Sequence, residues 1–575
     1  MTQVQPTNRP ERHTDWDTVN WRQANRSVRN LRQRIFKASK RSDWKTVRSL
    51  QKLMERSYSN RLVSTRRVTQ TNKGKNTAGV DKVLIKTPEA RSKFVDELST
   101  YQPWRARPVR RVYIPKTSGK LRPLGIPTIK DRALQAMIKN ALEPEWEATF
   151  EGSSYGFRPG RGAHDAISKI YLLARPNKRK KWVVDADIKG AFDNINHEHL
   201  LNTIGPFPGR EMIRQWLKAG YLEGGAFHDT EAGTPQGGVI SPLLANIALH
   251  GMEQALGVNY NKEGEIRGPR AVVRYADDFV VFCESKEDAE KVIRILTQWL
   301  AERGLTLSRE KTRIRHLTEG FDFLGFNIRH YKVSNTNTGY KLLIKPSNAS
   351  VKAIRSKMRA EWCALKGHSI KTVLERLNPK IRGWGNYFRI SVASETFRAL
   401  DHWMFFREVR YVHHMHHNKN TTWKTTKYWG KLNPYRENKW VFGDKQAKPP
   451  KYLMQFSWFK IERHVLVKGN ASRDDPALRE YWELHKQREL STLPLYQQRL
   501  AQAQNGDCPN CGTSLINGES LEEHHKRLRS RGGGNEKENL VLLHFYCQKQ
   551  IHSGKIRPKD ATGQPLLILD HEDEE

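Results

Sequence analysis

Three aspartates beside apolar segments are the residues of this sequence best suited to do chemistry. Asp187 lies at the end of the apolar run 182–188, and Asp277 and Asp278 interrupt the apolar stretch AVVRYADDFVVFCES. Carboxylate oxygens are preferred ligands of magnesium, and two magnesium ions about 3.5–4 Å apart can stabilise the entering and leaving oxygens of an in-line attack on phosphate. If the two segments meet, the three acids predict a two-magnesium site for phosphoryl transfer.

The paired acids are not equivalent. Successive side chains of a strand point to opposite faces, so one of the two should face the metal ions unless the turn brings both round, and we rank Asp277 first. An Asp-Asp pair at a hairpin tip can also serve the turn alone. The apolar strands on both sides favour metal binding, because an unpaired carboxylate held between them without a bound cation would cost free energy.

The composition indicates a polyanionic partner. The chain has 100 Lys and Arg against 61 Asp and Glu, a formal charge of +39, and its 16 Trp and 18 Tyr suit stacking on unpaired bases. A merely soluble basic protein is the plainer alternative. The sequence contains no run of about 18 apolar residues, and its polar N-terminus carries acids. We therefore expect no membrane partner and a location in the bacterial cytosol or nucleoid, or in an organelle.

Sequence patterns predict the elements that would position these acids. RRVYIPKTSGKLRPLGIP and AVVRYADDFVVFCES each predict a hairpin, and 182–188 and FDFLGFNI predict strands. Asp193 and Asn194 are expected to cap a helix that runs through Leu200. Residues 1–60 and 350–440 have basic helical patterns, and the second range is dense in aromatic residues.

Several blocks, in order and spacing, resemble those of group II intron-encoded reverse transcriptases, also called maturases. They are LGIPTIKDRALQ, SSYGFRPGRGAHDAI, DIKGAFD, GTPQGGVISP and RYADD, followed in the helical region by LNPKIRGWGNYFR. The resemblance implies an α+β fold: a right-hand polymerase with an antiparallel sheet in its fingers and palm, then a helical thumb. It also implies RNA-directed DNA synthesis with two Mg²⁺ ions.

The resemblance assigns roles residue by residue. Asp187, Asp277 and Asp278, together with Ile188, become magnesium ligands. Phe192 would stack under the incoming sugar and exclude a 2′ hydroxyl, although an ordinary core phenylalanine is the plainer alternative.

Five further residues would contact the nucleotide: Lys116, Lys120, Arg122, Gln236 and Gly237. A solvated basic turn is an equal alternative for the three cations. Glycine at Gly237 would permit close backbone approach.

A Cys/His unit near the C-terminus predicts a second metal site. C-x-x-C at Cys508 and Cys511 and H-x-x-C at His544 and Cys547 have the spacing of a structural zinc site. With three of the five cysteines gathered here, a disulfide framework is disfavoured.

The intervening sequence resembles the HNH endonuclease motif, a small ββα-metal fold. By that resemblance His525 is the general base, His524 and His552 bind a divalent metal, and Asn539 holds the loop that orients the base. Gln548 stands where the family usually has a histidine, and an amide oxygen is a weaker ligand than imidazole.

The expected domains are a basic helical N-terminal extension at 1–60, reverse transcriptase fingers and palm at 61–340, a thumb or maturase X domain at 345–440, a DNA-binding connector at 441–500 and a zinc-stapled HNH module at 501–565.

The resemblance implies intron splicing and mobility by target-primed reverse transcription. The partners would be the protein's own intron RNA, target DNA, an RNA template with a DNA primer, and deoxynucleotides. Alternatives are a splicing-only maturase, a defence-associated or retron-like reverse transcriptase, and an HNH nuclease with a structural RNA-binding arm.

Overall fold

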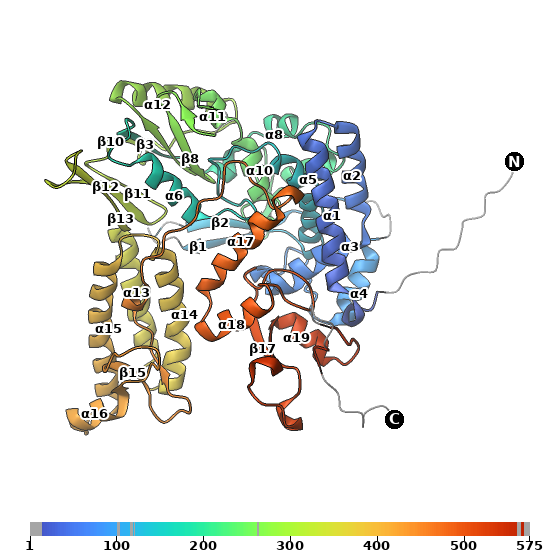
Figure 1. Ribbon diagram of the computed structural model, residues 1–575. Helices are drawn as coiled ribbons and strands as arrows, with labels where there is room; N and C mark the ends of the chain where they lie inside the picture. The colour runs from blue at the N-terminus through green and yellow to red at the C-terminus, as the bar shows by residue number, and fades with distance from the viewer. Residues whose placement is uncertain are drawn as a thin grey trace.

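The computed structural model describes residues 14–99, 104–115, 119, 121–261, 264–559 and 565–567. Its N-terminal part is a helical layer, drawn in blue in Figure 1, in which three helices pack against α5. Apolar residues on their inner faces, such as Val47 and Met54, are fully buried against α5 residues such as Ala141. The helices are α1 (Trp21–Lys40), α2 (Trp44–Arg56), α3 (Tyr58–Arg66), α4 (Pro88–Glu97) and α5 (Ile129–Glu147).

A four-stranded antiparallel sheet forms the palm, in the order β10-β3-β9-β8. Because side chains alternate along a strand, Val184 packs on the face covered by α12, whereas Val183 packs on the face covered by α6. The elements are α6 (Ala163–Leu173), β3 (Trp182–Asp187), β8 (Ala271–Tyr275), β9 (Asp278–Cys283), α12 (Lys286–Ala301) and β10 (Arg313–His316).

The fingers carry a second sheet in the order β2-β1-β4-β5. Its antiparallel hairpin pairs Ile114 with Arg122, so the hairpin expected around Gly119 is confirmed. The strands are β1 (Val109–Pro115), β2 (Leu121–Ile126), β4 (Tyr221–Glu223) and β5 (Ala226–His228).

Several short helices follow β3 along the chain, and here one expectation is wrong. Gly190 adopts a left-handed conformation that starts the short helix α7 (Ala191–Asn194), and the backbone is extended again at Asn196. The side chain of Asn196 therefore caps α8 (His197–Ile204), and Asp193 and Asn194 do not cap it. The remaining helices of this region are α9 (Arg210–Leu217), α10 (Ser241–Ala248) and α11 (Met252–Ala255).

The thumb is helical, as expected, and extends at the lower left of Figure 1. A three-stranded sheet of β11 (Phe321–Phe323), β12 (Phe326–Lys332) and β13 (Tyr340–Pro346) joins it to the palm. The thumb comprises α13 (Asn348–Ala364), α14 (Ile370–Phe388), α15 (Ser394–Met415), α16 (Thr421–Tyr428), β14 (Trp429–Gly430), β15 (Val441–Asp444) and β16 (Lys451–Tyr452).

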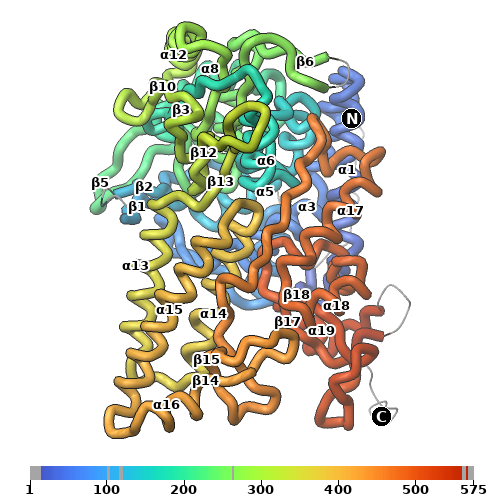
Figure 2. Tube along the Cα trace, turned by 60° about the vertical axis from the view of Figure 1, so that its left-hand side comes forward, coloured from blue at the N-terminus to red at the C-terminus, as the bar shows by residue number. Residues whose placement is uncertain are grey.

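After the thumb the chain turns back toward the N-terminal helices. Figure 2 shows this return as an orange trace that rises from β15 to α17. It ends in a ββα unit at the lower centre of Figure 1, so the α+β class is confirmed. These elements are α17 (Arg479–Glu489), α18 (Leu495–Ala503), β17 (Leu521–His525), β18 (Leu540–His544) and α19 (Phe545–His552).

Among the described residues, no helix combines the length and apolar character needed to cross a bilayer.

Candidate functional site

The three candidate acids meet at one end of the palm sheet. Asp187 on β3 lies directly opposite Asp278 on β9, and opposed residues of an antiparallel pair project to the same face. Asp277 lies in the two-residue turn between β8 and β9, where Ala276 has a φ of 59°. This turn brings both Asp277 and Asp278 within electrostatic reach of Asp187. Both acids of the pair therefore face the site, although side chains that alternate along a strand would place only one of them there.

The β8–β9 turn is held from behind by Arg274, which is 1% exposed. Its Nη1 donates to Asn246 Oδ1 at 3.1 Å and to the Ala276 carbonyl at 3.3 Å. The segment before α6 runs against the turn so closely that a Cβ on Gly156 would lie 2.3 Å from the Ala276 nitrogen. Only glycine at 156 permits this contact, which accounts for the glycine in SSYGF.

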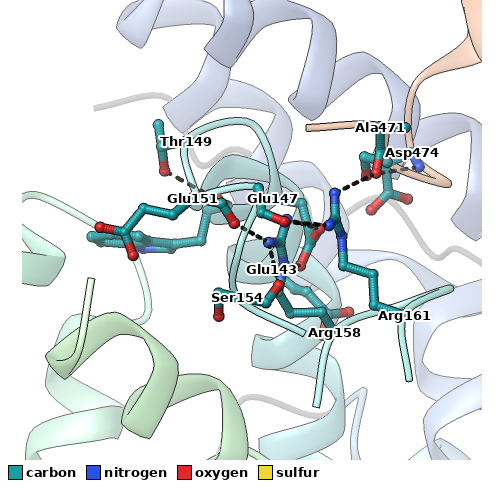
Figure 3. A network of polar contacts seen from close by, with 12 residues as sticks. Glu143, Glu147, Thr149, Glu151, Ser154, Arg158, Arg161, Ala471 and Asp474 are labelled. Carbon is teal, nitrogen blue, oxygen red and sulfur yellow. Dashed lines mark hydrogen bonds and ion pairs between the residues drawn. The ribbon is translucent and has the colours of Figure 1, made fainter. Parts of the chain in front are cut away.

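A buried ionic network fixes that segment in turn (Figure 3). Arg158 donates from Nε and Nη2 to the two carboxylate oxygens of Glu147, at 3.0 and 2.9 Å, and both side chains are 1% exposed. Its Nη1 donates to the carbonyls of Glu151 and Ser154. Arg161 reaches the Ala471 carbonyl on the returning chain at 3.1 Å. The network therefore links α5, the palm and the return segment.

The electrostatics of the acid cluster favour a cation. Burial raises the pKa of Asp277, and repulsion from Asp187 adds to the rise, while Arg122 of the fingers and Lys311 oppose it. The pKa of Asp278 is raised to about 7. The main cause is its partial removal from water, and repulsion from the charges of Asp277 and Asp187 adds to the rise. Carboxylates that repel one another in this way are stabilised by a divalent ion between them.

The four Cys/His residues come together in the ββα unit. One ligand atom from each of Cys508, Cys511, His544 and Cys547 lies within 4.8 Å of the others, and all four residues are buried. Ligands of a tetrahedral zinc are separated by roughly 3.8 Å, so small side-chain adjustments close the site around one ion. Three sulfurs and one imidazole are a donor set suited to that metal.

The predicted nuclease residues surround one end of the same unit. The rings of His524 and His552 lie 5.0 Å apart. Burial lowers the pKa of His524 to about 4, which keeps its ring neutral, and one ring nitrogen contacts the Leu566 carbonyl at 2.7 Å. Gln548, on the same helix as His552, is half-buried.

Asn539 clamps the loop that follows the candidate base His525. Its side chain donates to the carbonyls of Arg527 and Gly534 at 3.1 and 2.8 Å and accepts from the Arg527 nitrogen at 2.7 Å. His525 itself is solvent-accessible, with Nε2 3.0 Å from Asn535 Oδ1. Asn539 therefore ties Arg527 and Gly534, the two sides of this loop, together.

Comparison with known proteins gives four family matches along the chain: "N-terminal domain of reverse transcriptase" at 16–98, "Reverse transcriptase (RNA-dependent DNA polymerase)" at 114–328, "Group II intron, maturase-specific domain" at 351–429 and "HNH endonuclease" at 508–554. Protein YkfC of Escherichia coli (strain K12) is 37% identical over 307 residues, which cover 46% of this chain and 80% of that protein. Group II intron-encoded protein LtrA of Lactococcus lactis subsp. cremoris is 29% identical over 584 residues, which cover 84% of this chain and 92% of that protein. The chain belongs to the group II intron-encoded reverse transcriptases. It is an RNA-directed DNA polymerase with maturase and HNH domains.

Other residues that the reverse transcriptase resemblance singled out lie next to the fingers hairpin and to the segments that flank the palm sheet. Phe192 is half-buried beside Phe157, with ring centroids 6.3 Å apart. Gln236 donates to Asp193 Oδ2 at 3.3 Å, and its carbonyl accepts from the Gly125 nitrogen of the fingers hairpin at 2.7 Å. Gly237 has a φ of 122°, a conformation that favours glycine. Lys116 and Lys120 lie outside the described residues.

The backbone groups of Ile188 face away from the segment 306–308. The neighbours on either side bond to the segment 306–308: the Lys189 nitrogen donates to Thr306, and Ser308 donates to the Asp187 carbonyl. Because backbone groups alternate along an extended chain, the Ile188 carbonyl points the opposite way, toward the side where β9 pairs with β3.

Sequence reasoning missed two residues of this reverse transcriptase site. Lys311 Nζ lies 2.7 Å from Asp187 Oδ2 and supplies the one ion pair recorded for that carboxylate in the described part of the chain. Asp185 precedes Asp187 by two positions and so projects to the same face, and burial raises its pKa to about 6. The alternation along β3 could have revealed Asp185, whereas Lys311 reaches the site from a loop that no strand pattern marks.

Proposed function

We propose that the chain copies RNA into DNA at Asp187, Asp277 and Asp278, with two magnesium ions held by these carboxylates and by the Ile188 carbonyl. The observation that carries the proposal is the pairing of Asp187 with Asp278 across β3 and β9, with Asp277 in the adjoining turn. Bound magnesium would neutralise the phosphate oxygens and stabilise the entering and leaving oxygens. Arg122, whose charge acts on Asp277 from the fingers hairpin, would bind the triphosphate.

The magnesium requirement tests this assignment. The pKa of Asp278 lies at about 7, above its ordinary value of 3.8, so its carboxylate is lost as pH falls through 7. Metal binding needs that carboxylate. We therefore expect the Mg²⁺ concentration for half-maximal primer extension on an RNA template to rise about tenfold from pH 8 to pH 6.

The Asp278→Asn variant is the matched control, because it removes the titrating group. It should need more Mg²⁺ at every pH and lose most of the pH dependence. A wild-type requirement that stays flat between pH 6 and pH 8 would contradict the role of Asp278 as a metal ligand.

Sugar selection is assigned to Phe192. Its ring is half-buried beside Phe157, which follows the Gly156 that packs against the β8–β9 turn. An aromatic face there would meet the 2′ position of the incoming sugar. We expect Phe192→Val to raise ribonucleotide incorporation relative to deoxynucleotide incorporation by roughly 10–100-fold, since the steric barrier of the ring is lost. Single-nucleotide incorporation kinetics measure this ratio, and Phe157→Val, which changes the neighbouring ring, is the control. Unchanged discrimination in Phe192→Val would remove that role.

The thumb is proposed to bind the intron RNA. Its match to a maturase-specific domain is joined by exposed aromatic side chains, with Tyr435 64% and Trp440 60% accessible. A lysine lies over a third aromatic ring of the thumb: Lys427 Nζ is 4.8 Å from the Trp423 ring centroid. Such groups bind phosphate and stack on unpaired bases, and so would stabilise the folded ribozyme for splicing.

The HNH module is proposed to hold structural zinc and to nick the target DNA. Cys508, Cys511, His544 and Cys547 would bind the zinc, which holds the small fold together. His525 would remove a proton from the attacking water beside a divalent metal bound by His524, His552 and Gln548. The 3′ end released by the nick would then prime the polymerase.

A further inference from the structure

The ββα unit is not a free appendage, because it shares a buried apolar core with the N-terminal helices. Trp16, Trp21 and Leu62 lie in one hydrophobic cluster with Cys508, Leu543 and other residues of the unit. The cysteines of the metal tetrad are therefore part of an interface between segments more than 400 residues apart in the sequence. Figure 1 shows α19 beneath the N-terminal helices.

Polar contacts tie the same segments together at the tetrad. The loop between Cys508 and Cys511 presents its carbonyls to α1, where Asn25 Nδ2 donates to the Cys511 carbonyl at 3.0 Å and Arg22 donates to the Pro509 carbonyl. On α19, Gln550 Nε2 donates to the carbonyls of Asp17 and Val19, each at 2.9 Å. The docking contacts therefore involve the loop of the first metal-binding pair and α19, the helix that carries Cys547.

Arg66, at the end of α3, reaches the metal-binding sulfurs directly. Its Nη2 donates to Cys547 Sγ at 3.0 Å, and its guanidinium lies 4.6 Å from the Trp21 ring. The residue is 7% exposed. Among the described residues its nearest carboxylate is Glu519, at 4.0 Å, and its Nη1 is buried with no hydrogen-bond partner. A buried cation so weakly paired with acids needs another source of negative charge.

The tetrad supplies that charge when it holds zinc. Three thiolates and one neutral imidazole around a divalent ion carry a net charge of −1, and the four ligating residues are buried. One guanidinium cancels this charge and donates a charge-assisted hydrogen bond to a ligand sulfur. Without the ion, this fixed anionic centre is lost, and Glu519 at 4.0 Å is the nearest carboxylate to Arg66 in the described part of the chain.

We propose that Arg66 is the interdomain counter-ion of the Cys508–Cys511–His544–Cys547 zinc centre, so that zinc occupancy holds the HNH module against the N-terminal domain of the reverse transcriptase. Because coupling between two equilibria is reciprocal, docking tightens zinc binding by the same factor by which zinc tightens docking. Arg66 is thus a positioning residue for the nuclease. The inference rests on the zinc assignment made above and deepens it.

The test uses the full-length protein loaded with zinc. Arg66→Met keeps an unbranched apolar stem and removes the charge, so we expect zinc transfer to a chromogenic chelator to be about 10–100-fold faster than in the wild type. Arg66→Lys, which keeps the charge but replaces the planar guanidinium by a compact ammonium, should be intermediate. This second variant keeps the test informative if Arg66→Met folds poorly. Arg61→Met removes a half-buried cation from the same helix, over Tyr58 and not the tetrad, and should release zinc at the wild-type rate.

Hydrogen exchange provides the readout for docking. Chelating the zinc of the wild type should increase exchange in both α1 and α19, and Arg66→Met should reproduce much of that increase while zinc is still present. Chelation of Arg66→Met should then add less than it adds to the wild type, which is the signature of coupling. Equal zinc retention in Arg66→Met and Arg61→Met, or additive effects on exchange, would overturn the proposal.

Failure of the zinc assignment is a different result. If the wild type contains no zinc after purification and reconstitution, both the structural zinc and the role of Arg66 fall. If zinc is present at one equivalent and its release is indifferent to Arg66, the metal assignment stands and the coupling alone is refuted.

Discussion

Asp277→Ala is expected to reduce primer extension on an RNA template by at least about a thousandfold, which corresponds to about 4 kcal/mol of transition-state stabilisation. The variant loses a carboxylate that lies in the turn beside Asp187 and Asp278, where the two proposed magnesium ions would be held. Single-turnover extension of a DNA primer, at saturating Mg²⁺ and deoxynucleotides, measures the loss.

The variant should fold at least as well as the wild type. Asp277 and Asp278 repel each other, so removal of one charge relieves strain and the melting temperature should not fall. Asp322→Ala removes an exposed acid from the neighbouring β11, where it bonds to Asn327, and should leave synthesis unchanged. Persistent synthesis by Asp277→Ala, or equal loss in both variants, would refute the assignment of the acid cluster.

His525→Ala is expected to abolish nicking of target DNA while polymerisation continues. General-base catalysis contributes about 10²–10⁴ to rate, so nicking should fall by that factor. His525 is accessible to water at the end of β17, and Asn539 holds the following loop in place. A supercoiled plasmid carrying the target site measures nicking, and primer extension measures polymerisation in the same preparation.

The control for this variant is His414→Ala, which removes an exposed histidine from α15 of the thumb. It should nick like the wild type. If His525→Ala nicks as fast as the wild type, the general base lies elsewhere. If the wild type itself does not nick, Gln548 has cost the module its metal, and the nuclease role is lost while the polymerase assignment stands.

Local patterns predicted what local spacing controls. The two hairpins, the palm strands, the helical thumb and the Cys/His tetrad all follow from residues close together in sequence, and the structure confirms them. The prediction that Asp193 caps the helix is wrong for a local reason that residue types do not reveal. Gly190 adopts a left-handed backbone conformation and starts the separate short helix α7, so α8 begins only at His197.

Contacts between distant segments were beyond such patterns. Arg274 supports the catalytic turn through Asn246 on α10, Lys311 meets Asp187 from 124 positions away, and Arg66 reaches Cys547 from 481 positions away. Each is one arginine or lysine in a chain with 100 of them, so composition gives no signal for any one. Their roles depend on burial and on the chemistry of the partner, which only the fold brings together.

The joint core of the two ends of the folded chain has a consequence for synthesis on the ribosome. Trp16 and Trp21 are translated before Leu543 and Ile551 of the same cluster, which emerge more than 500 codons later. The nascent N-terminal domain must therefore wait without this part of its apolar cover while the palm and thumb are made. During that interval it is open to chaperones, which recognise such apolar surface.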